Sequence, residues 1–227
     1  MLLFQEIRNY IHQLLADQSI AAGDKLPSER ALQEQFSSTR ITVREALLRL
    51  EAEGLIYSQK RRGWFVTPAK LKWHPATKVN FYELAKQQGF KADTLVIDLT
   101  IKANFSDSGI NAPSLYHLQR VRSLDNRAVM YEDIYCDTQR FEQLESHSLN
   151  GSITDIMATQ YNTVVCKENS VISVTVLPDH VAIKLEKNSG TPCLKIIRKR
   201  YDECHALVDN NIEYWLHNAI EMIVDGQ

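Results

Sequence analysis

Residues 23–56 read GDKLPSERALQEQFSSTRITVREALLRLEAEGLI, and the spacing of their apolar and polar side chains decides the fold at this end of the chain. Ser28 precedes a short helical pattern and is a residue type that caps helices. Ser37-Ser38 interrupts this pattern, and a second helix is predicted over residues 39–53. Gly54 follows where helices commonly end in a left-handed residue. Two helices separated by so short a break predict a helix-turn-helix.

The segments on either side complete a larger unit. Residues 4–17 place their apolar side chains on one stripe, which predicts a helix before the pair. Residues 55–57 and 64–66 are apolar runs on either side of the basic tip Lys60-Arg61-Arg62-Gly63, the pattern of a β-hairpin. Three helices and a hairpin predict a winged helix-turn-helix over residues 1–68.

A domain of this kind contacts DNA through polar side chains on its second paired helix, while the opposite face packs on the core. Arg40 and Arg44 are four residues apart and share one face, from which a guanidinium can bond guanine or phosphate in a bidentate manner. The alternative interpretation is a solvated helix face, and Arg49 is interpreted as a surface residue. The DNA-binding candidates are Ser28, Arg30, Thr39, Arg40, Thr42, Arg44, Lys60, Arg61 and Arg62.

Residues 23–32, 38–47 and 50–56 closely resemble the GntR family of bacterial transcription regulators, and the resemblance covers nearly all of residues 5–67. It implies that the residues at Arg30, Arg40 and Arg44 contact operator DNA and that the wing reaches the minor groove. The wing departs from the family pattern Gly-x-Gly-Thr-Phe-Val, because this chain reads Arg61-Arg62-Gly63-Trp64-Phe65-Val66. The wing is therefore more basic, and its individual contacts stay open.

The rest of the chain has a different organisation. Residues 68–75 contain two prolines and no clear period, so a linker is predicted over residues 69–78. Residues 79–227 mix strand-like and helical runs, which predicts an α+β domain on an antiparallel sheet. Strands are predicted at 94–101, 114–123, 128–136, 170–177, 192–201 and 212–216, and helices at 80–89, 139–145, 153–161 and 180–185.

A second domain of this size and type resembles the UTRA domain of the HutC branch of the family, whose fold is chorismate lyase-like. Residues 118–122, the turn Asp125-Asn126, residues 131–135 and Gly151-Ser152-Ile153 carry the resemblance, as do two later runs at 198–202 and 212–214. It implies dimerisation through the C-terminal sheet. It also implies an effector site, with the candidates Arg120, Arg122, Glu132, Ser152 and Thr154.

In sugar-phosphate-binding members, the residues matching Arg120, Arg122 and Ser152 hold a phosphate, and the one matching Glu132 binds polar groups of the ligand. The chemistry agrees, because alternate residues of a strand point to one side and a serine at a helix N-terminus adds donors. The alternative interpretation is that the two arginines pair with Glu132 or Asp133 across the hairpin.

Two departures leave the effector open. Thr154 stands where sugar-phosphate binders usually carry tyrosine, and residues 215–221 replace the common Tyr-Arg-x-Asp-Arg tail. A sugar phosphate, a phosphonate or a carboxylate therefore remains possible. His217 and Asn218 are weaker pocket candidates, since a lone histidine is more often structural.

Composition favours a soluble cytoplasmic protein. The net charge is −2, yet residues 1–70 hold ten of the 26 Lys and Arg and eight of the 28 Asp and Glu, a mildly basic end. No apolar run approaches the roughly 18 residues of a membrane span, and the first residues lack a secretion signal. The four cysteines are scattered, which is typical of reduced thiols rather than a disulfide framework.

The leading hypothesis is a homodimeric repressor that leaves a near-palindromic double-stranded DNA operator when a small anionic effector binds. A transcriptional activator is the first alternative, and a chorismate lyase-like enzyme is the second. The sequence shows no Ser/His/Asp order, no metal-ligand cluster and no Gly-rich phosphate loop. We therefore expect no catalytic residue, no metal and no cofactor.

Overall fold

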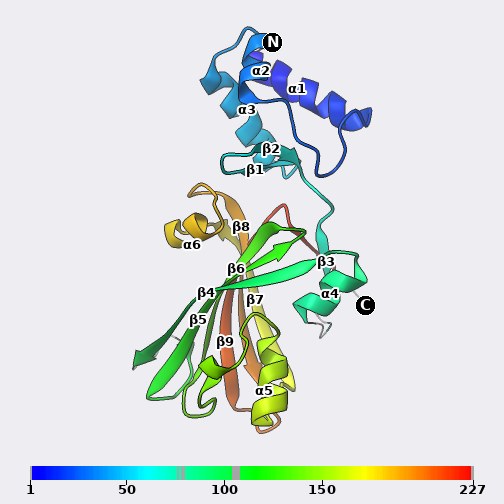
Figure 1. Ribbon diagram of the computed structural model, residues 1–227. Helices are drawn as coiled ribbons and strands as arrows, with labels where there is room; N and C mark the ends of the chain where they lie inside the picture. The colour runs from blue at the N-terminus through cyan, green and yellow to red at the C-terminus, as the bar shows by residue number, and fades with distance from the viewer. Residues whose placement is uncertain (1, 76, 78–79, 104–107, 226–227) are drawn as a thin grey trace.

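The computed structural model describes residues 2–75, 77, 80–103 and 108–225. Figure 1 shows a small helical head above a long twisted sheet. The head holds α1 (Leu3–Ala16), α2 (Glu29–Gln35), α3 (Arg40–Ala52) and the hairpin of β1 (Ile56–Gln59) and β2 (Gly63–Val66). This is the winged helix-turn-helix that the sequence predicts.

Local chemistry explains where the helices of the head begin and end. The hydroxyl of Ser28 accepts a hydrogen bond from the backbone of Ala31, and that of Thr39 accepts one from Thr42, so each caps a helix. Gly54 follows α3 with φ of 78°, a left-handed conformation that glycine adopts without strain. The apolar stripes of all three helices meet the wing in one core, which contains Ile7, Ile11, Leu26, Leu32, Val43, Ala46, Leu47, Leu50, Ile56, Trp64 and Val66.

The second domain is built on one antiparallel sheet of six strands in the order β4-β5-β6-β9-β8-β7. The strands are β4 (Ala92–Ala103), β5 (Ser114–Leu124), β6 (Arg127–Asp137), β7 (Lys167–Val176), β8 (Pro192–Tyr201) and β9 (Leu207–Leu216). Asp125 and Asn126 turn β5 into β6 with φ of 50° and 63°, which fits the tight hairpin expected of this pair. Arg120 lies opposite Glu132 in the resulting register.

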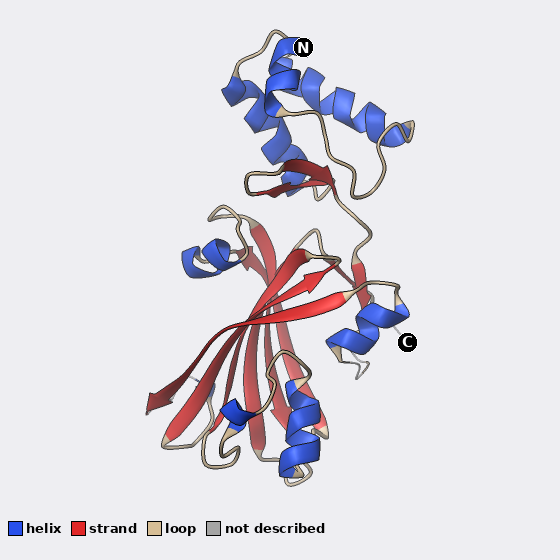
Figure 2. Cartoon of the chain, viewed as in Figure 1, coloured by secondary structure: helices blue, strands red, loops and turns tan. Residues whose placement is uncertain are grey.

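Helices cover parts of this sheet (Figure 2). They are α4 (Phe81–Gln87), α5 (Ile153–Tyr161) and α6 (Asp179–Lys184). One core of the domain lies near the head and includes Trp73, Phe81, Val181 and Trp215, while another lies near α5 and includes Phe141 and Met157. Within the residues that the structure describes, no helix is long and apolar enough to cross a membrane.

The segment predicted to be a linker contains a strand. β3 (Leu71–Trp73) pairs in parallel with β10 (Ile220–Met222), close to the carboxyl end of the chain. Leu71 and Trp73 are buried in the core of the second domain. Irregular chain therefore occupies less of residues 69–78 than predicted, although residues 76 and 78 of that linker, and residue 79 after it, lie outside the described part.

A second difference concerns the helix predicted at residues 139–145. The structure has turns there, followed by a single 3-10 turn, η2 (Leu144–Ser146). Phe141 and Leu144 are buried as a helical spacing demands, but Gln143 takes a left-handed φ of 57° between them, which ends any α-helix. The apolar spacing was correct and the backbone conformation was not.

Candidate DNA-binding and effector sites

The predicted DNA-contacting arginines of α3 share one carboxylate. Arg40 Nε lies 3.2 Å from Glu29 Oε2, and Arg44 Nε lies 3.9 Å from Glu29 Oε1. Trp64 of the wing also donates its indole N–H to Glu29 Oε1, at 3.2 Å. Trp64 replaces a threonine of the family pattern, and it ties the wing to the start of α2.

The other candidates in the head lie at helix starts. The Thr39 and Thr42 hydroxyls lie 2.9 Å apart at the N-terminus of α3. Ser28 caps α2, and the exposed Arg30 pairs with Glu34 four residues further on, at 2.9 Å. The structure thus groups Thr39, Thr42 and the two arginines at one end of α3.

The wing tip carries Lys60, Arg61 and Arg62, all exposed. Arg61 has φ of 63°, so it takes the left-handed turn position that the family pattern gives to glycine. The Arg62 guanidinium packs 5.5 Å from the ring centre of Phe65. Three cations on a short hairpin form a basic projection that suits a phosphate backbone.

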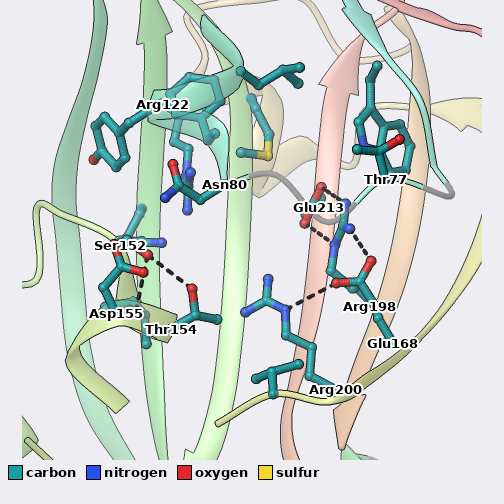
Figure 3. A pocket seen from close by; sticks show the side chains of 18 of the residues that line it. Thr77, Asn80, Arg122, Ser152, Thr154, Asp155, Glu168, Arg198, Arg200 and Glu213 are labelled. Carbon is teal, nitrogen blue, oxygen red and sulfur yellow. Dashed lines mark hydrogen bonds and ion pairs between the residues drawn. The ribbon is translucent and has the colours of Figure 1, made fainter. Parts of the chain in front are cut away.

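The effector candidates lie around a cavity of about 360 Å³ in the second domain (Figure 3). Its walls come from β5, β6, β7, β8 and β9, from α4 and α5, and from the pair β3 and β10. The lining includes Arg120, Arg122, Ser152 and Thr154 but not Glu132. Four of the five predicted residues therefore surround one cavity.

Glu132 lies behind the arginines and is fully buried. Its Oε1 accepts from Arg120 Nε at 2.7 Å and from Arg122 Nε at 2.8 Å, and its Oε2 accepts from Asn211 at 3.1 Å. Burial opposes the charge of Glu132, but the two guanidinium groups outweigh burial and lower its pKa to about 2. In this geometry Glu132 does not line the cavity and positions the two arginines, so its contact with the ligand stays a prediction.

Arg120 is almost wholly committed to the protein. Besides Glu132, its Nη1 donates to the backbone carbonyls of Leu149 and Gly151, at 2.9 and 2.8 Å. Burial lowers the pKa of Arg120 to about 10, which still leaves the group charged at neutral pH. Arg120 thus pairs with Glu132 across the hairpin, as the alternative interpretation anticipated, and it also joins the loop before α5 to the sheet.

Arg122 differs from Arg120 in what its outer nitrogens do. Its Nε is bonded to Glu132, and its guanidinium packs 4.8 Å from the ring centre of Phe81. Among the described residues, neither Nη1 nor Nη2 of Arg122 has a hydrogen-bond partner, and the side chain lines the cavity (Figure 3). Arg122 thus presents two free donors to the cavity.

Ser152 and Thr154 lie beside these donors at the N-terminus of α5 (Figure 3). The Ser152 hydroxyl accepts from the backbone of Asp155 at 3.2 Å and lies 3.0 Å from the Thr154 hydroxyl. Both hydroxyls line the cavity. Free backbone N–H groups at a helix start favour an anion, so Arg122 and this turn form a corner of the cavity whose chemistry suits an anion.

The sequence prediction missed the opposite wall, where charged side chains form an ion-pair network. Arg198 pairs with Glu168 and with Glu213, and its Nε lies 2.9 Å from Glu213 Oε1. Arg200 Nη1 lies 3.2 Å from Asp209 Oδ2. Arg198 and Arg200 alternate along a predicted strand as Arg120 and Arg122 do, and this alternation was the signal available.

His217 and Asn218 do not line the cavity, and they contact the head instead. The His217 ring nitrogens lie 3.0 Å from the carbonyl oxygens of Pro192 and Glu51. Asn218 accepts a hydrogen bond from Arg127, whose guanidinium packs 4.3 Å from the ring centre of Tyr57. These residues join the end of β9 to α3 and β1.

Lys187 adds to the same contact between the domains. Its ammonium donates to the carbonyl of Ser58 at 2.5 Å and lies 3.5 Å from Glu51 Oε1. Burial lowers the pKa of Lys187, and Glu51 partly opposes that shift. We call Arg127, Lys187, His217 and Asn218, with Glu51, Tyr57 and Ser58 of the head, the interdomain clasp.

Comparison with known proteins agrees with both halves of this architecture. Residues 3–66 match the model of bacterial regulatory proteins of the gntR family, and residues 110–221 match the UTRA domain. The "Uncharacterized HTH-type transcriptional regulator YihL" of Escherichia coli (strain K12) is 30% identical over 97% of this chain and 96% of its own length. This chain belongs to the GntR family. With its UTRA domain it fits the HutC-type subfamily, and it is a bacterial transcription regulator.

More distant relatives share the full length of this GntR regulator. The "Probable fructoselysine utilization operon transcriptional repressor" of Escherichia coli (strain K12) is 24% identical over 100% of this chain and 95% of its own. Among solved structures, PhnF from Mycobacterium smegmatis superposes with a TM-score of 0.67 and 20% identity, over 97% of this chain and 99% of that one. At that identity the likeness to PhnF shows the fold alone.

Proposed function

We propose that this GntR regulator is a cytoplasmic homodimeric repressor that leaves a near-palindromic operator when a small anion binds the UTRA cavity. Anions of three classes fit: a sugar phosphate, a phosphonate or a carboxylate. The observation that carries the proposal is the corner formed by Arg122, Ser152 and Thr154. There, two guanidinium donors without a partner in the described chain face the free N-terminus of a helix.

Repression is supported by the fructoselysine operon relative, which is named as a probable transcriptional repressor. Two-fold symmetric dimers of winged-helix proteins bind near-palindromic operators, because operator symmetry follows protein symmetry. In this proposal Arg30, Arg40 and Arg44 contact the operator, with Ser28, Thr39, Thr42 and the wing tip on the phosphate backbone. Because Arg40 and Arg44 pair with Glu29 in the free chain, DNA must replace that carboxylate.

The clasp gives the effector a structural route to DNA. Trp215 and Ile220 line the cavity, and between them in the chain lie His217 and Asn218, which contact the head. A ligand changes DNA affinity only if it binds the DNA-incompetent arrangement more tightly than the competent one. The turn from β9 to β10 is where those two arrangements would differ.

The test uses the purified full chain and a duplex that the chain selects from random-sequence DNA. Fluorescence anisotropy measures its affinity while glucose 6-phosphate, glucosamine 6-phosphate, 2-aminoethylphosphonate or urocanate is added. We expect one of these anion classes to release the duplex. With Arg122→Gln we expect unchanged DNA affinity in the absence of the anion. The anion concentration needed to release the duplex should rise at least about tenfold, because a charge-assisted contact of this kind contributes about 1.5–3 kcal/mol.

A matched control is Lys195→Gln, which removes a cation from β8 on the face of the sheet turned away from the cavity. The Lys195 ammonium packs against Tyr214, and neither residue lines the cavity. This variant should respond like the wild type. If a ligand released the duplex from Arg122→Gln and from the wild type at the same concentration, Arg122 would not be part of the effector site. Reporter output that falls on gene deletion would indicate an activator instead.

A further inference from the structure

A large apolar side chain stands among the charged groups of the DNA-contacting helix. Ile41 is the second residue of α3 and lies between Arg40 and Thr42. Its side chain is 81% exposed, whereas Val43 and Leu47 on the other face of α3 are fully buried. Ile41 belongs to none of the apolar clusters formed by the described residues.

The fold gives no reason for isoleucine at this position. Ile41 lies at one end of a shallow groove along α3 that also includes Arg44, Glu45, Leu48, Arg49 and Ala52. A β-branched residue at an exposed helical position also lowers helix propensity relative to alanine or leucine. An exposed isoleucine therefore gains its contacts only when another molecule covers it.

The neighbours of Ile41 indicate that this molecule is DNA. Arg40, Arg44, Thr39 and Thr42 surround it, and these are groups that bond phosphates and base edges. In helix-turn-helix proteins the N-terminal residues of the second helix meet the bases in the major groove. The apolar group exposed on base edges in that groove is the 5-methyl of thymine.

We propose that Ile41 contacts a thymine methyl in each half-site and thereby selects a T·A pair at that position. Arg40 and Arg44 fix the register of α3 on the DNA by bonding phosphates or guanine. Ile41 adds recognition of thymine, which these two arginines do not provide. Leu48 lies seven residues, or about 10.5 Å, further along the helix axis. Leu48 therefore lies too far from the leading end of α3 to reach the same base.

The first experiment compares the DNA selected from a random-sequence duplex pool by the wild-type chain and by Ile41→Ala. Alanine keeps α3 helical and shortens only this side chain. We expect the two selected sites to agree except at one position in each half-site. There the wild type prefers thymine, and the variant accepts other bases.

The second experiment removes the methyl from the DNA. In the duplex selected by the wild type, deoxyuridine replaces thymine at that position, so that the base pair is kept and the methyl is lost. We expect wild-type affinity to fall about fourfold per half-site, the value for burying one methylene group. The affinity of Ile41→Ala should not change between the two duplexes, because the contact is already missing.

The matched control is Leu48→Ala, which shortens a 41% exposed side chain of the same groove. It should keep the wild-type thymine preference and the wild-type response to deoxyuridine. Equal thymine preference in Ile41→Ala and wild type, or no effect of deoxyuridine on the wild type, overturns the assignment of Ile41. If the wild type enriches no sequence at all, sequence-specific DNA binding is refuted and Ile41 reads no base.

Discussion

The carboxylate of Glu132 shows at the scale of one residue how the side chains of the candidate effector site are held in place. It bonds the Nε atoms of Arg120 and Arg122 and thereby fixes the planes of both guanidinium groups. With its pKa near 2, Glu132 stays ionised throughout the physiological range. Arg122 can then turn its two outer nitrogens towards the cavity, because its inner nitrogen is already satisfied.

We predict that Glu132→Gln destabilises the fold at pH 7 by about 3–5 kcal/mol, because two buried arginines lose their counter-ion. Urea unfolding at pH 7 measures this cost, and Glu203→Gln is the control, since Glu203 is exposed. A change in Glu132→Gln no larger than in the control would show that the buried arginines do not depend on this carboxylate.

Glu132 also determines how the stability of the fold changes with pH. The folded pKa of Glu132, about 2, lies below its ordinary value of 4.5, so its ionisation stabilises the fold fully above pH 4.5. That contribution, roughly 3 kcal/mol, is lost as the pH falls from 4.5 towards 2. The difference in stability between wild type and Glu132→Gln should therefore be largest at neutral pH and shrink in acid.

At the scale of elements, the interdomain clasp joins the wing to the effector domain. Glu51, in the last turn of α3, accepts from the backbone and hydroxyl of Ser58 in β1, both at 2.9 Å, and lies 3.5 Å from Lys187. Lys187 reaches β1 from the segment after α6. The strand that leads into the wing is thus part of the contact with the domain that binds the effector.

We predict that Lys187→Met loosens the two domains, because it removes the ammonium donors and keeps the apolar stem. Limited proteolysis at residues 67–70 should become up to about tenfold faster, which corresponds to the loss of a charged hydrogen bond of about 1.5 kcal/mol. Lys184→Met is the control, since Lys184 is exposed on α6. Equal cleavage rates in the two variants would show that Lys187 does not hold the domains together.

At the scale of the whole molecule, the attraction to DNA is confined to the head. Residues 71–227 hold 16 Lys and Arg against 20 Asp and Glu, so the body carries a net charge of −4 and does not attract a polyanion. We predict that replacing Lys60, Arg61 and Arg62 together by glutamine weakens binding to all DNA sequences similarly. The slope of log affinity against log salt should fall by up to about 3 per head, since each phosphate contact contributes about 0.9.

A second triple variant distinguishes the effect of net charge from the effect of where the charges lie. Lys91→Gln, Lys102→Gln and Lys184→Gln remove the same charge from exposed sites in the effector domain. Anisotropy titrations between low and moderate salt should give this variant the wild-type slope. If both triple variants lowered the slope equally, net charge rather than the wing would control DNA affinity.

The predicted head agrees closely with the structure because its signals are local. Ser28 and Thr39 cap helices through contacts three residues away, and Gly54 ends α3 through its own φ. The strand limits at residues 192–201 and the helix limits at residues 153–161 were likewise predicted without error. When apolar side chains recur with a regular spacing over eight or more residues, the spacing indicates which face of the helix or strand is buried.

Features that depend on distant partners were not predictable in this way. β3 is three residues long and pairs with β10. Nothing in the sequence around residue 71 indicates that this segment pairs with a strand at residue 220. The family resemblance singled out Glu132 as a contact of the ligand, but no local pattern could show that two arginines cover it. The roles of His217 and Asn218 needed the position of the head, which no local pattern encodes.

The pairing of β3 with β10 has a mechanical consequence. Thr67 is still hydrogen-bonded to Leu55 in the head, and Leu71 begins the strand that is anchored to β10. Pro68, Ala69 and Lys70 are therefore the whole tether, with a reach of about 11 Å when fully stretched. Leu71 and Trp73 also form part of the cavity wall. If that wall moves, only these three residues can absorb the displacement. A larger displacement is transmitted to the hairpin of the wing.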